Sequence, residues 1–339
     1  RPGRRGFVQC GAMIAPAMLH VLVACESTLD GGGKPPRDSA DTALVDTGDT
    51  ADTAPPFDSV PDPVEYDCEA LPASPLEDNE LDGPRGYHDV IFDREGYGIG
   101  FDGSSLVRAT YEGDTDVFLP RPGNIQQMDW LPDGDLVVGD DFAQDIKRVS
   151  AAGASTVLAG GLGAVYGVVT GPDGRVYVVN GRSIYRVDPR TGDSTEWFRL
   201  RGGVQAHTIA FRPGDQHAYV GTIGSGRIYT IEFDDDYTAV SEPEEYATIE
   251  GSGWHDGLGF DACGNLFVAD YYTSGLYRVG ADLEVTTFYR GRQRQYGHGL
   301  EWGSGLGGWR ADALYLPQPY DNNTVREVVI GVPSAWAVD

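Results

Sequence analysis

The sequence HDGLGFDACGNLFVADYYTSGLYRV, residues 255–279, decides the fold of this chain. Leu258 and Phe260 alternate with small residues before a turn at residues 261–265, and apolar runs follow at residues 266–269 and 276–279. Alternating apolar residues bounded by polar, Gly-containing turns are typical of short antiparallel strands. One such unit cannot bury its own face, so this stretch predicts that further copies pack against it.

Five further copies lie between residue 85 and the C-terminus. Each opens with an inner strand, and two further strands follow after polar turns, with a fourth strand in all repeats but the last. The openings are 38, 40, 41, 49 and 42 residues apart and begin at His88, Gln126, Tyr166, His207, Asp256 and His298. A period near forty with four strands per unit is the signature of a β-propeller. The sequence therefore predicts an all-β fold, a six-bladed β-propeller with four-stranded blades over residues 66–339.

The last repeat lacks an obvious fourth strand. Residues 75–81 precede the first repeat in the way that a fourth strand precedes each later one. We expect the segment 66–84 to pair with the last blade and close the ring, because closure removes the open edges of the sheets.

The N-terminal part has the pattern of an export signal and a linker. In residues 1–25 three arginines precede an apolar run that ends at Cys25, and this resembles a bacterial lipoprotein signal in which Cys25 carries the lipid. Residues 26–65 are acidic and rich in Asp, Thr and Pro, which predicts a disordered linker. We expect an exported protein, periplasmic or on the outer surface, that contacts the membrane only through its lipid anchor.

The net charge limits the possible partners, and the cysteines suggest a possible disulfide. A net charge of -27 argues against nucleic acid, whose binding depends on Lys and Arg. We expect a monomer that binds a small anionic ligand or an unknown protein. Cys68 and Cys263 fall on the same face of adjacent predicted blades, and they form either a disulfide or two free thiols.

Polar residues occupy equivalent positions at the inner-strand openings. His88, His207 and His298 are three of the six histidines, and Asp256 holds the same position in another repeat. Imidazoles with a carboxylate are the ligand set of zinc or another transition metal, which can activate water at an open coordination position. The alternative is a hydrogen-bonded polar plug.

Two motifs carry a family resemblance: Asp256-Gly257-Leu258 with residues 261–269, and PDGRVYV at residues 172–178. They resemble the gluconolactonase and senescence-marker-protein family and, more loosely, the NHL-repeat propellers. The resemblance implies a divalent cation at the channel mouth and matches Asp256 to one of its ligands. His88 and His207 stand where that family has Glu and Asn, so the cation expected is zinc or another transition metal rather than calcium. The His-rich channel mouth also resembles that of lyases built on NHL-type propellers, in which a tyrosine takes part. This resemblance makes Tyr166 the candidate base.

Arginines gather in the connections that lead into the inner strands: Arg85, Arg121, Arg199, Arg201, Arg290, Arg292 and Arg294. A guanidinium matches a carboxylate or phosphate, so Arg292 or Arg294 is expected to anchor an anionic ligand, with surface ion pairs as the alternative.

Two functions follow. One is a metal-dependent hydrolase, lactonase-like, or a lyase on a small anionic or sugar-derived substrate. The other is a non-catalytic ligand- or protein-binding propeller with structural histidines.

Overall fold

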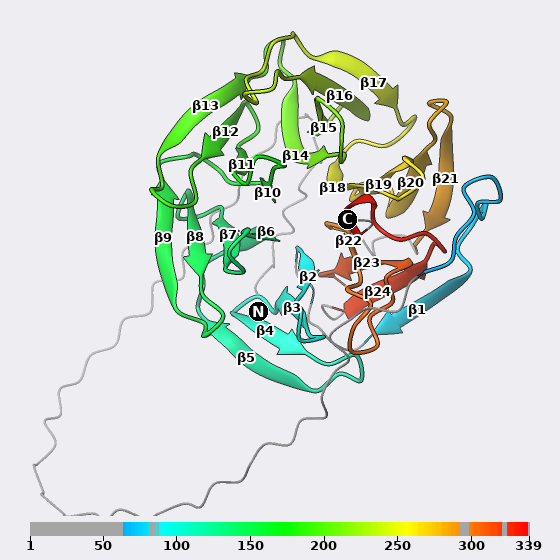
Figure 1. Cartoon of the computed structure of the whole chain (residues 1–339), viewed down its shortest axis with the longest axis horizontal. Helices are drawn as coiled ribbons and strands as arrows, with labels where there is room; N and C mark the ends of the chain where they lie inside the picture. Colours follow the sequence, from blue (N-terminus) through cyan, green and yellow to red (C-terminus); the bar gives the residue numbers. More distant parts are fainter. Residues whose placement is uncertain (1–63, 82–85, 87, 292–297, 321–323, 338–339) are drawn as a thin grey trace, which may run out of the picture. The chain divides into compact units, whose positions relative to one another are not determined.

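Six four-stranded antiparallel sheets surround a central channel in the computed structural model, which describes residues 64–81, 86, 88–291, 298–320 and 324–337 (Figure 1). The prediction of a six-bladed, all-β propeller is confirmed. The predicted signal segment 1–25 with Cys25, and the linker up to residue 63, lie outside the described residues. Among the described residues, no helix is long and apolar enough to cross a membrane.

Each blade runs from an inner strand beside the channel to an outer strand at the rim. Blade 1 contains β2 (Val90–Phe92), β3 (Gly98–Phe101), β4 (Ser105–Ala109) and β5 (Thr115–Pro120). Blade 2 contains β6 (Ile125–Trp130), β7 (Leu136–Asp140), β8 (Asp145–Val149) and β9 (Ser155–Gly160). Blade 3 contains β10 (Gly167–Thr170), β11 (Val176–Val179), β12 (Ser183–Val187) and β13 (Ser194–Arg199). Blade 4 contains β14 (Gln205–Phe211), β15 (His217–Ile223), β16 (Arg227–Glu232) and β17 (Glu244–Thr248). Blade 5 contains β18 (His255–Phe260), β19 (Leu266–Asp270), β20 (Gly275–Val279) and β21 (Val285–Arg290). Blade 6 contains β22 (Glu301–Trp302), β23 (Ala313–Gln318), β24 (Thr324–Val329) and β1 (Glu77–Leu81).

The position of a strand in its blade follows from its composition. Second strands such as β11, VYVV, are buried along their whole length because both faces pack against neighbouring blades. Outer strands such as β5, TDVFLP, expose most of their residues and carry polar side chains. The apolar core therefore lies between blades.

The ring is closed by the N-terminal strand. β1 pairs antiparallel with β24, from Glu77 opposite Val329 to Leu81 opposite Val325, which is the pairing expected from the sequence. Arg326 reinforces this join through ion pairs to Asp78 at 3.0 Å and Glu80 at 3.1 Å.

A disulfide joins Cys68 to Cys263, whose Cα atoms are 5.4 Å apart. It ties the segment before β1 to the first turn of blade 5. The C-terminal segment is held at the same turn, because the N–H of Ala262 donates to the carbonyl of Pro333 at 2.9 Å. Both ends of the described chain therefore meet on one face of the propeller.

Candidate functional site

Bulges in two inner strands turn key side chains out of their ladders. The β14–β15 register shifts between Ala206 and Thr208, and the β18–β19 register shifts between His255 and Gly257. His207 and Asp256 are the extra residues, and a bulge re-aims the side chain at that position. The sequence folds in this way where a polar residue interrupts an otherwise apolar inner strand.

His88, His207, Asp256 and His298, which were predicted as a ligand set, lie together at one end of the channel. Nδ1 of His207 lies 2.7 Å from Oδ1 of Asp256, and Nδ1 of His298 lies 2.9 Å from Oδ2. Nδ1 of His88 lies 3.0 Å from Nδ1 of His298. We call these residues the His–Asp cluster and this end of the channel the upper mouth. Because they come from blades 1, 4, 5 and 6, only the closed ring brings them together.

The charges of the cluster are set by burial and by its own members. Burial alone would raise the pKa of Asp256, but the positive fields of His207 and His298 outweigh it and hold this pKa below its ordinary value. Burial, with the charge of His298 second, lowers the pKa of His88 to about 3. At neutral pH the cluster therefore contains an ionised carboxylate and a neutral His88.

Trp254 selects the tautomer of His207. An indole N–H can only donate, and Nε1 of Trp254 lies 3.2 Å from Nε2 of His207. Nε2 must therefore accept, and the proton of a neutral His207 is on Nδ1, facing Asp256. This arrangement turns the Nδ1–H group of His207 towards the carboxylate, 2.7 Å from Oδ1.

His298 is arranged differently. Its Nδ1 faces Asp256, while its Nε2 is buried and has no hydrogen-bond partner among the described residues. An imidazole held at one nitrogen by a carboxylate, with the other nitrogen free, has the arrangement of a general base. The carboxylate oxygens of Asp256 also lack an aligned hydrogen-bond donor in the described part of the chain, so their contacts with the two histidines are close approaches rather than aligned hydrogen bonds.

The cluster as it stands does not fit a formed metal centre. Zinc with ligands at about 2.1 Å in a tetrahedron keeps the ligand atoms roughly 3.4 Å apart, whereas His207 and Asp256 are 2.7 Å apart. His207 also carries its proton on the nitrogen that would bind the ion. Calcium requires six or more oxygen ligands, and the cluster contains one carboxylate. Within the described ranges no group of three or more His, Cys, Asp or Glu side chains could hold a metal ion. The ligand roles of His88, His207, Asp256 and His298 stay a prediction.

Tyr166 lies in the site but is poorly suited to be its base. Its ring stacks on His207, with centroids 5.1 Å apart. Burial, and then the charge of Asp141, raises its pKa above 10.0, so the phenol keeps its proton near neutral pH. The ring contact gives Tyr166 a packing role, and its predicted role as the base stays a prediction.

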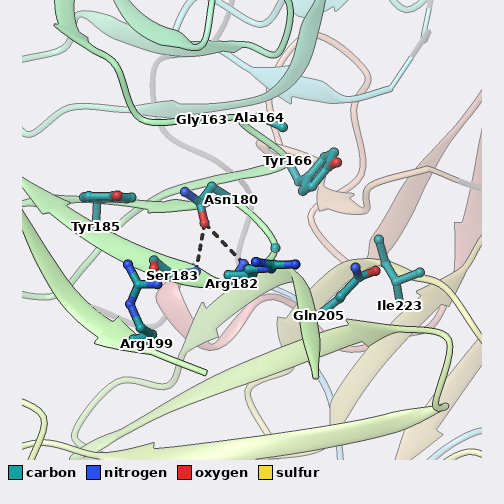
Figure 2. A pocket seen from close by; sticks show the side chains of 11 residues that line it. Gly163, Ala164, Tyr166, Asn180, Arg182, Ser183, Tyr185, Arg199, Gln205 and Ile223 are labelled. Atoms are coloured by element: carbon teal, nitrogen blue, oxygen red, sulfur yellow. Dashed lines mark hydrogen bonds between the residues drawn. The ribbon is translucent and has the colours of Figure 1, made fainter. Parts of the chain in front are cut away.

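A cavity of about 280 Å³ opens beside Tyr166 (Figure 2). Asn180 shapes its floor by accepting the backbone N–H groups of Arg182 at 3.2 Å and Ser183 at 2.8 Å. The Arg182 side chain lines the cavity, and no carboxylate in the described residues forms an ion pair with it. Sequence reasoning missed Arg182 because it lies in the turn between β11 and β12, away from the strand openings.

The predicted arginines divide into three groups. Arg85, Arg292 and Arg294 lie outside the described residues, so the predicted anchors have no structural test. Arg199 pairs with Glu196 at 2.6 Å, and Arg201 lies 3.9 Å from Glu242, as the surface-pair alternative expects. Arg121 and Arg290 are exposed.

Gln127 is a second residue that the sequence did not indicate. Its Nε2 donates to the backbone carbonyl of Asp256 at 2.7 Å, and its Oε1 accepts the N–H of Val168 at 3.2 Å. The repeat alignment pointed to Gln126, but the β6–β7 register shifts between Ile125 and Met128. Blade 2 therefore supports the Asp256 backbone from across the channel.

Fold and site together define a six-bladed β-propeller with the His–Asp cluster at one mouth of its channel. No protein-family model matches the sequence, and no curated protein matches it significantly.

Solved structures match the fold. A gluconolactonase from Xanthomonas campestris is 15% identical with a TM-score of 0.61, over 82% of this chain and 96% of that chain. Regucalcin, a calcium-binding protein from Agrobacterium tumefaciens, is 16% identical with a TM-score of 0.60, over 75% and 94%. A catalytically inactive histidine-to-alanine variant of virginiamycin B lyase from Staphylococcus aureus, with quinupristin, is 19% identical with a TM-score of 0.53, over 75% and 88%. Auxiliary nutrient-binding proteins of Bacteroides also match. At these identities the matches show the fold alone.

Proposed function

We propose that the His–Asp cluster is the active site of a hydrolase, lactonase-like, or a lyase that acts on a small anionic or sugar-derived substrate. The observation that carries this proposal is the pairing of Asp256 with His298, whose Nε2 is buried and lacks a partner in the described chain. Gluconolactonase and virginiamycin B lyase propellers among the fold matches are consistent with both chemistries.

The geometry supports proton transfer at His298. In a hydrolase, Nε2 takes a proton from water, the oxygen attacks the ester carbonyl, the ring C–O bond breaks, and the imidazolium returns its proton to the leaving oxygen. In a lyase, Nε2 takes a proton from carbon, the C–H electrons form the new double bond, and the leaving group departs with its bonding electrons. In both cases Asp256 stabilises the imidazolium that forms.

The substrate class rests on the cavity beside the cluster. Tyr166 connects the two, because it stacks on His207 and also lines the cavity with Arg182. A guanidinium without a carboxylate partner in the described chain suits a carboxylate or phosphate on the substrate.

A non-catalytic binding propeller is the second candidate. His207 faces partners at both ring nitrogens, Asp256 and Trp254, as a structural histidine does. Nutrient-binding proteins among the fold matches agree with this candidate.

A panel of small lactones, neutral and carboxylated, separates the two candidates when acid release by the full chain is followed at constant pH. We expect turnover that falls at least 100-fold in His298→Ala and changes less than about twofold in His217→Ala, a matched histidine outside the cluster. Turnover that is insensitive to His298→Ala, or no turnover of any lactone or elimination substrate, would favour the binding protein.

A further inference from the structure

A second cavity, of about 600 Å³, lies at the other end of the inner strands. In strand β6, Gln127 lies near the His–Asp cluster and Trp130 ends the strand. In blade 6, Glu301 follows His298 by three residues, or roughly 10 Å of extended chain. Trp130 and Glu301 therefore lie towards the end of the channel opposite the cluster. We call this end the lower mouth. Its cavity is lined by the aromatic side chains of Tyr66, Phe92, Trp130, Trp302 and Trp336 and by the carboxyl groups of Asp129 and Glu301.

The indole rings present apolar surface to this cavity. Nε1 of Trp130 donates to the carbonyl of Phe92 at 2.9 Å, and Nε1 of Trp302 donates to the carbonyl of Val332 at 3.1 Å. Because these N–H groups are bonded to the backbone, the rings have only their π-systems to offer a ligand. Trp336 is 48% exposed, so it can move onto a ligand without leaving a packed core.

The carboxyl groups are not neutralised by the protein around them. Asp129 accepts the backbone N–H groups of Trp130 at 2.7 Å and Thr170 at 2.6 Å, and Glu301 accepts that of Trp302 at 3.2 Å. No lysine or arginine of the described chain lines this cavity; Arg94 lines the adjoining cavity that shares Asp129 and Glu301, and no ion pair among the described residues joins it to either carboxyl group. Burial raises the pKa of Asp129 to about 6, and burial with the neighbouring Asp129 and Asp89 raises that of Glu301. A cation bound beside these two carboxyl groups would favour their ionised forms.

The walls of the cavity are held in place by both chain ends. Tyr66 lies two residues before Cys68, which is bonded to Cys263, and the same turn holds Pro333 of the C-terminal segment that carries Trp336. The disulfide thus fixes the segment that carries Tyr66, and a backbone hydrogen bond holds the segment that carries Trp336.

We propose that this lower-mouth cavity binds a small organic ammonium ion, between the aromatic rings and the carboxyl groups of Asp129 and Glu301. The negative face of an aromatic ring attracts an alkylammonium group, and the carboxylates supply the opposite charge. A metal ion would instead need several oxygen ligands converging on one point, and the described residues form no such group.

Choline and 3,3-dimethylbutan-1-ol test this directly, because they have the same shape and differ in charge. The full chain is titrated with each by calorimetry in two buffers of different ionisation enthalpy. We expect saturable choline binding with proton release at pH 7, and binding of the alcohol at least about tenfold weaker. Tetramethylammonium and Mg²⁺ titrations separate the organic cation from a simple salt effect.

Variants locate the site. Trp336→Ala is expected to weaken choline binding about tenfold and Trp336→Phe about twofold, whereas Phe142→Ala, an exposed aromatic residue outside the cavity, leaves it unchanged. Glu301→Gln provides a second test if Trp336→Ala is unstable. Equal affinity for the neutral alcohol, no saturation with choline, or full binding in Trp336→Ala and Glu301→Gln would overturn the proposal. Choline binding should survive His298→Ala, so this site and the proposed active site can fail independently.

Discussion

The two mouths of the channel are formed by the same inner strands but use their polar side chains in opposite ways. At the upper mouth, bulges release His207 and Asp256 from the ladder, and these side chains contact one another across blades. At the lower mouth, carboxyl groups bond to backbone: Asp129 accepts the N–H groups of Trp130 at 2.7 Å and Thr170 at 2.6 Å, and Glu301 accepts that of Trp302 at 3.2 Å. The difference teaches that the local register decides whether a polar side chain of an inner strand contacts side chains of other blades or bonds to backbone.

Asp256→Asn is the strongest way to break this comparison. An amide cannot stabilise an imidazolium or hold His298 in its acceptor form, so kcat should fall about 10⁴-fold. Choline binding at the lower mouth should be unchanged. The control is Asp116→Asn, which changes an exposed aspartate on β5. A kcat within tenfold of wild type would remove Asp256 from the proton-transfer step.

Loss of the disulfide should affect the lower mouth selectively. Cys263→Ser frees the segment that carries Tyr66 and removes a cross-link between residues 195 positions apart. We expect the free energy of unfolding in urea to fall by about 2–5 kcal/mol, with weaker choline binding and an unchanged kcat. Wild-type protein measured with and without dithiothreitol is the control, and identical unfolding curves would contradict a stabilising bond.

The sequence reveals the blades more completely than the site. Leu, Val and Ile recur with a forty-residue period because every blade must bury both faces, so the strands and the closing role of residues 75–81 could be predicted. His88, His207, Asp256 and His298 could also be grouped, because the repeats align them. Gln127, Trp254 and Arg182 could not, because a bulge in β6 and contacts between blades decide their roles, and neither leaves a local pattern.

Asp89→Asn should show a pH dependence set by the burial of this carboxyl group. Burial raises the pKa of Asp89 to about 8, above its unfolded value near 3.8. Its contribution to stability is therefore present below about pH 4 and is lost as the pH rises to 8. Relative to wild type, Asp89→Asn should gain about 1.4 kcal/mol per pH unit across this range, measured by urea unfolding at pH 5, 6, 7 and 8. A difference that is constant with pH would contradict the buried, protonated carboxyl.

His88→Gln should show the opposite pH dependence. Burial lowers the pKa of His88 to about 3, below the ordinary 6.5, so its contribution is present above pH 6.5 and is lost as the pH falls. Between pH 6.5 and 4.5 the variant should gain about 1.4 kcal/mol per unit relative to wild type. His217→Gln is the control, since that histidine is partly exposed beside Asp215. If both variants showed the same slope, burial at the upper mouth would not be the cause.

Tyr166→Phe should have the smallest effect and sharpen the division of roles at the upper mouth. The stacking on His207 survives without the hydroxyl, and a phenol with a raised pKa does not remove protons near neutral pH. We therefore expect kcat to fall less than about tenfold, whereas loss of a catalytic base costs 100-fold or more. Tyr166→Ala, which removes the stacking ring, should cost more than Tyr166→Phe. If Tyr166→Phe instead matches His298→Ala in kcat and shifts the pH–rate profile, the base predicted from the family resemblance is Tyr166, and His298 serves to position it.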